Sequence, residues 1–130
     1  MEWQSKLLDW KKYYQSLLDP KTMKKIEREP LFVTLGDLGE IAGRYKSPDV
    51  TGGPIHIIEM STFLAEAEAK ETFGHEFAHM VMWCLYGIGN HGKRWRRLMT
   101  VLGLPPLPCH TLNLKGRKTL RLAQERLTVL

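Results

Sequence analysis

The sequence predicts a single small α+β domain, and three features of the 130-residue chain carry that prediction. Apolar side chains recur at helical spacing near the N-terminus. Short runs rich in β-branched or aromatic residues, separated by glycine and proline, then indicate a small three-stranded sheet. Two further helical stretches follow. The expected elements are a helix at 3–18, strands at 31–35, 41–46 and 55–59, and helices at 64–86 and 92–102.

The first helix presents one apolar stripe, formed by Trp3, Leu7, Trp10, Tyr14 and Leu17. The pair Asp19-Pro20 ends this helix, because the residue before a proline is disfavoured in helical conformation. The charged stretch 21–29 fits either a short helix or a loop. Turn residues at 36–39 separate the first two strands, and the proline- and glycine-containing stretch 47–54 reads as the connection of a hairpin.

The central helix is rich in Ala and Glu at its start, and Ser61 or Thr62 can supply its N-cap. Gly74 lies inside it at a cost of about 1 kcal/mol relative to Ala, so we expect a neighbouring backbone to pack close there. Gly103 and Pro105 end the following helix. Residues 105–108 are expected to be extended, and 115–130 to form either a helix or a mobile tail.

Residues 75–79 read H-E-F-A-H, an H-E-x-x-H motif within the central helix. Histidines four residues apart lie on one face of a helix, so His75 and His79 can reach one metal ion, with Glu76 beside it as a general base. The alternative is a polar helix face that carries two histidines by chance. Apolar flanking residues disfavour that alternative, because they predict a buried helix whose polar groups need partners.

A catalytic zinc ion takes three protein ligands and keeps one open position. His91 is the candidate third ligand, twelve residues after His79 and beyond the helix stop signals Gly87 and Gly89. His110 is the reserve candidate. A glutamate third ligand is not expected, because Glu125 is the only Glu after Glu76.

Residues 74–105 resemble the core of the SprT-like family, which includes the protease Spartan. The resemblance rests on H-E-x-x-H at 75–79 and on H-G-K-R-W at 91–95, followed by a helix. It implies a zincin-like minimal metalloprotease domain in which His75, His79 and His91 bind Zn²⁺ and Glu76 is the catalytic acid/base. It also implies substrates that are bound or crosslinked to DNA. This chain has no C-x-x-C pair, so the zinc ribbon that many of these proteins carry is not expected.

The positive charge is concentrated near the C-terminus, where residues 93–130 hold 9 Lys and Arg against one acid, whereas 1–92 hold 10 against 13 acids. Such a surface attracts phosphate backbones without reading sequence; the alternative is a solvated basic helix face. Trp95 could stack on a base, although its spacing favours packing on the central helix. We therefore expect a metalloprotease domain at 1–110 and a basic tail at 111–130. The cations concerned are Lys93, Arg94, Arg96, Arg97, Lys115, Arg117, Lys118, Arg121 and Arg126.

These patterns predict a zinc-dependent endopeptidase, with Tyr45 and His110 as open candidates for stabilising the oxyanion. The alternative is a non-catalytic, zinc-stabilised module that binds nucleic acid or protein. Cys84 is expected to be a small buried side chain, a metal contact at Cys109 remains open, and His56 is interpreted as a strand residue rather than a ligand. Without an export signal or an 18-residue apolar run, we expect a cytoplasmic monomer that does not contact membranes.

Overall fold

The computed structural model describes residues 2–87 and 89–120, and within them it confirms the α+β class. Residues 114–120 form a further helical segment. Within the described residues, no helix is both long and apolar enough to cross a membrane. The elements are η1 (Glu2–Lys6), α1 (Leu7–Ser16), α2 (Pro20–Ile26), β1 (Leu31–Gly36), β2 (Gly43–Lys46), α3 (Pro48–Thr51), β3 (His56–Ser61), α4 (Glu66–Tyr86) and α5 (Lys93–Val101).

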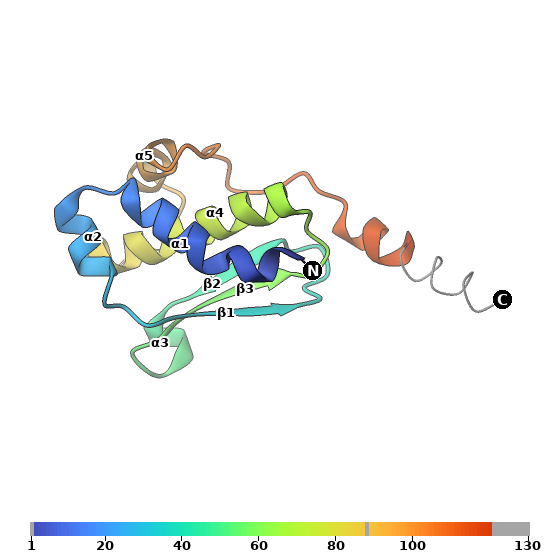
Figure 1. Ribbon diagram of the computed structural model, residues 1–130, viewed down its shortest axis with the longest axis horizontal. Coiled ribbons are helices and arrows are strands. Elements are labelled where there is room, and N and C mark those ends of the chain that lie inside the picture. Colours follow the sequence, from blue (N-terminus) through green and yellow to red (C-terminus); the bar gives the residue numbers. More distant parts are fainter. Residues whose placement is uncertain (1, 88, 121–130) are drawn as a thin grey trace.

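The three strands form one sheet in the order β1-β3-β2. β3 pairs parallel with β1 and antiparallel with β2, so the expected hairpin between the second and third strands is present, with α3 inside its connection. His56, Ile58 and Met60 alternate along β3 and are buried. α4 contacts both β2 and β3, and Figure 1 shows α1 and α4 on the same side of the sheet.

The core between α1 and α4 is aromatic, because the apolar stripe of α1 meets the buried face of α4. The Tyr14 ring stacks on Phe73 and Phe77, with centroids 6.3 and 6.4 Å apart. A Cβ at Gly74 would lie 2.5 Å from Leu104 Cδ1 and 2.7 Å from Tyr14 Cζ. The expected close approach is therefore real, but side chains make it rather than a neighbouring backbone.

The start of α4 differs from the sequence prediction. Ser61 is the last residue of β3, and its hydroxyl accepts a hydrogen bond from the Phe63 N–H, so it does not cap the helix. Ala65 occupies the N-cap position, and its N–H donates to Glu68 Oε1 at 2.8 Å. The strand continues to Ser61 because its last residues still pair with β1, and the helix begins at Glu66, two residues later than expected. β2 likewise begins at Gly43 rather than at residue 41.

After α5 the chain returns along α4 toward the first turn of that helix (Figure 1). Leu114 is 1% exposed and belongs to the hydrophobic core. Arg117 donates to both oxygens of Glu68, and Lys118 pairs with Asp37. These contacts hold the described part of the basic tail against the domain. Arg121 and Arg126 lie outside the described residues.

Candidate metal centre

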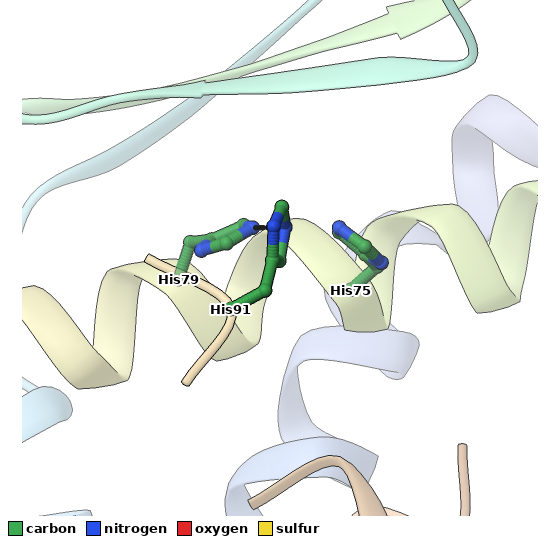
Figure 2. Close-up of side chains that lie close together, drawn as sticks. All are labelled: His75, His79 and His91. Atoms are coloured by element: carbon green, nitrogen blue, oxygen red, sulfur yellow. Dashed lines mark hydrogen bonds between the residues drawn. The ribbon is translucent and has the colours of Figure 1, made fainter. Parts of the chain in front are cut away.

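Three histidines from two elements converge at α4. His75 and His79 lie one helical turn apart on α4, and His91 lies in the connection that leads to α5. One ring nitrogen of each lies within 4.8 Å of the others. Figure 2 shows a ring nitrogen of His79 directed at a ring nitrogen of His91, with the His75 ring nearby. α4 ends at Gly87, whose φ of 67° is left-handed and favours glycine, so the chain can reverse there.

The spacing of the nitrogens fits a shared ion. His79 Nε2 and His91 Nε2 are 2.9 Å apart. Two nitrogens bound to one tetrahedral zinc at 2.0–2.1 Å would be separated by about 3.4 Å. A small rotation of either ring would accommodate the ion. The other ring nitrogen of His79, Nδ1, is buried and has no hydrogen-bond partner among the described residues.

Trp95 lies next to all three imidazoles. Its ring centroid lies 5.0 Å from that of His75, 5.6 Å from His79 and 4.5 Å from His91. The indole is fully buried, at 0% exposure, which confirms that it packs on α4 rather than facing solvent. The indole therefore packs against all three imidazoles.

The electrostatics keep the three rings neutral at pH 7. Burial, together with the His91 side chain, lowers the pKa of His75 to about 4. Burial and the two neighbouring histidines lower the pKa of His79 to about 3. The pKa of His91 is also lowered, by burial and by Arg96. Neutral imidazole is the form that binds metal ions, so the rings already have the required protonation state.

Glu76 is 6% exposed and lies between α4 and β2. Burial raises the pKa of its carboxyl to about 8, although a hydrogen bond from the Tyr45 backbone N–H opposes the rise. Glu76 Oε1 lies 3.6 Å from His75 Nε2. A Cβ at Gly43 would lie 2.6 Å from Thr72 Cγ2 and 3.3 Å from Glu76 Cγ, so glycine lets β2 approach the carboxylate. A carboxyl that titrates near neutrality can accept and donate a proton.

Two hollows meet at His75 and Glu76. One, of about 450 Å³, lies between residues 40–43 and 104–112 and has mostly apolar walls. The other, of about 480 Å³, is lined by His79 and His91 as well as by Tyr45. The candidate catalytic carboxyl therefore lies on a continuous surface depression rather than in a closed cavity.

The other residues that the sequence singled out have different partners. The Tyr45 hydroxyl lies 2.6 Å from His56 Nδ1. His110 Nε2 donates to the Glu40 carbonyl at 2.6 Å, and its Nδ1 accepts from the Leu112 N–H. Cys109 is exposed. The structure therefore places His110 in the wall of the apolar hollow rather than with the three histidines.

The four cations of α5 are exposed. The Arg94 guanidinium lies over the Tyr86 ring at 4.1 Å from its centroid. Arg117 and Lys118 pair instead with acids of the domain, as described above. Among the C-terminal cations that the structure describes, Arg117 and Lys118 are thus paired with acids, whereas those of α5 have no acidic partner and lie close together: Lys93, Arg94, Arg96 and Arg97.

The fold and the site define a small α+β protein with a candidate H-E-x-x-H metal centre. The sequence model of the SprT-like family matches residues 11–113, and the chain belongs to that family. It is 42% identical over 55 residues to Protein SprT of Pseudomonas aeruginosa LESB58, covering 40% of this chain and 33% of that protein. It is 40% identical over 60 residues to Protein SprT of Pseudomonas savastanoi pv. phaseolicola 1448A, covering 44% and 37%. The matches span about a third of these relatives, and no solved structure matches.

Proposed function

We propose that this protein is a zinc-dependent endopeptidase of the SprT type. The observation that carries the proposal is the meeting of three neutral imidazoles with the buried carboxyl of Glu76 at a surface depression. His75, His79 and His91 would hold the ion. Family membership supports the same assignment, because their positions match the motifs on which the resemblance rests.

Zinc held by these residues would polarise a carbonyl group and lower the pKa of a water molecule. Glu76 accepts the proton of the attacking water and then transfers it to the nitrogen of the leaving amine. The Tyr45 N–H and the close approach of Gly43 fix the position of Glu76 for both transfers. Trp95 keeps the three rings in place throughout.

Glu76→Gln tests the assignment of the base, since the amide is nearly isosteric but cannot accept the proton. We expect zinc content to match wild type while casein cleavage falls about 10²–10⁴-fold, the usual contribution of general acid–base catalysis. Cleavage at the wild-type rate would remove Glu76 from the mechanism.

We also propose that its substrates are proteins attached to DNA, with α5 as the DNA contact. The support is the cluster of four exposed cations on α5 next to His91. Binding should be independent of sequence and should weaken steeply with salt. Replacing Arg94, Arg96 and Arg97 with Gln should weaken it and flatten its salt dependence.

A charge-matched control is available on α2, where Lys21, Lys24 and Lys25 are also exposed. Replacing these three lysines with Gln removes the same charge from another face. Equal loss of DNA binding in the two triple variants would point to net charge rather than to α5. The alternative function, a non-catalytic zinc-stabilised binding module, is favoured if zinc-loaded protein cleaves nothing even with DNA present.

A further inference from the structure

A second group of potential metal ligands lies apart from the three histidines. Glu29 precedes β1, His56 begins β3, and Cys84 lies in the last turn of α4. One ligand atom of each lies within 4.8 Å of the others. His56 is only 1% exposed, and the other two are partly buried. We propose that Glu29, His56 and Cys84 form a second metal site, for a thiophilic divalent cation such as Zn²⁺.

The distances between the ligand atoms fit one shared ion. His56 Nε2 lies 3.1 Å from Glu29 Oε2 and 3.9 Å from Cys84 Sγ. A tetrahedral zinc would separate nitrogen from oxygen by about 3.4 Å and nitrogen from sulfur by about 3.6 Å. A single ring nitrogen carries at most one proton, so it can donate to only one of these two neighbours at a time. An ion placed between the three atoms would bind all of them.

The other ring nitrogen of His56, Nδ1, has a hydrogen-bond partner that is compatible with metal binding at Nε2. His56 Nδ1 lies 2.6 Å from the Tyr45 hydroxyl. Without an ion, that hydroxyl donates to Nδ1 while Nε2–H donates to Glu29. With an ion on Nε2, the proton resides on Nδ1 and donates to the Tyr45 oxygen, which a hydroxyl can accept. Such a partner fixes the tautomer and orientation of a ligating histidine.

Charge balance also favours a divalent cation here. Without an ion, the Cys84 thiol is protonated at neutral pH, as free thiols ordinarily are. Metal binding would release that proton to solvent, leaving a thiolate, a carboxylate and a neutral imidazole around the ion. The two negative charges cancel those of the cation, so this partly buried site becomes neutral overall.

The consequence would be structural, because the three ligands tie the segment before β1, the sheet and the end of α4 together. The inference does not depend on the proposed peptidase activity, since the second site shares no residue with the three-histidine site.

Cobalt distinguishes the two sites, because only a thiolate ligand gives Co²⁺ a charge-transfer band in the near ultraviolet, and the three-histidine site has no sulfur.

The experiment titrates the full chain with Co²⁺ and follows that band in wild type, Cys84→Ser, Cys109→Ser and His91→Ala. We expect the band in wild type, its loss in Cys84→Ser, and its retention in the other two. Total metal should fall from about two equivalents in wild type to about one in Cys84→Ser. Far-ultraviolet circular dichroism checks that each variant is folded.

Absence of a thiolate band in folded wild type at excess Co²⁺ would overturn the proposal, and so would an unchanged band in Cys84→Ser. Loss of the band in Cys109→Ser but not in Cys84→Ser would assign the sulfur to the exposed cysteine instead. In each of these three cases, Glu29, His56 and Tyr45 would form a hydrogen-bonded chain without metal. Failure of casein cleavage would leave the cobalt result unaffected.

Discussion

α4 contributes to two polar clusters of different construction. The three-histidine centre takes two residues from one face of the helix and a third from the connection that follows it. The cluster of Glu29, His56 and Cys84 draws on three segments that are far apart in sequence. The first brings together neutral imidazoles, a buried carboxyl group and a surface depression, which suits catalysis. The second combines a carboxyl group, an imidazole and a thiol, and none of these three described residues lines either hollow, which suits structural stabilisation.

The largest expected effect separates the two clusters by activity. His79→Ala should abolish casein cleavage, because it removes one of the three proposed zinc ligands. Cys84→Ser should retain cleavage but lower the melting temperature of the zinc-loaded protein. Side-by-side activity and thermal unfolding measurements check both expectations. Complete loss of cleavage in folded, metal-loaded Cys84→Ser would contradict the division of roles.

A large effect on stability is expected from replacing Trp95, which packs against the three histidines. Trp95→Ala should lower the free energy of unfolding by about 3–5 kcal/mol, the usual cost of removing a buried Trp. It should also weaken zinc binding, since all three rings contact the indole. Denaturant unfolding and zinc titration measure the two effects. Zinc affinity equal to wild type in the folded variant would show that Trp95 does not orient the rings.

A smaller effect should follow from closing the gap between β2 and α4. Gly43→Ala places a methyl group 2.6 Å from Thr72 Cγ2 and 3.3 Å from Glu76 Cγ. We expect a loss of about 1–3 kcal/mol from overpacking, together with reduced turnover. Gly53→Ala is the matched control, because no atom lies within 4 Å of its added Cβ. Equal stability and turnover in both variants would contradict the tight fit at Gly43.

The smallest effect concerns the ion pair that holds the returning chain to α4. Arg117 lowers the pKa of Glu68 in the folded protein, so the pair stabilises above the unfolded pKa of about 4.3. That contribution is lost as pH falls through the lower folded pKa. Arg117→Gln should therefore cost about 0.2–1 kcal/mol at pH 7. The difference from wild type should shrink at acidic pH in urea unfolding; a difference that grows there would exclude this pair as its source.

The part of the structure that sequence could predict is the part that local spacing encodes. The helical repeat brings His75 and His79 onto one face, and glycines after α4 allow His91 to return. The β-branched, apolar run at 55–59 similarly predicted a strand, which the structure places at His56–Ser61. The three histidines do converge, but convergence by itself does not demonstrate metal binding or catalysis. Their assignment as zinc ligands and that of Glu76 as the base therefore stay predictions.

Other features depend on tertiary contacts that no local pattern encodes. The pairing of His56 with Tyr45 requires the antiparallel register of β2 and β3, and Glu29 and Cys84 join it only after α2 and α4 have packed. The N-cap at Ala65 was missed because Ser61, a residue type that often caps helices, belongs to the strand instead. The docking of Arg117 on Glu68 likewise could not be read from a run of basic residues.

The central claim is that His91 completes the metal centre, and zinc analysis of His91→Ala beside His110→Ala tests it most directly. Both are made in a Cys84→Ser background, so that the second cluster binds no zinc. We predict about one equivalent of zinc in the background protein and in His110→Ala, and almost none in His91→Ala. Full zinc content in folded His91→Ala, or loss of zinc in His110→Ala alone, would contradict the account.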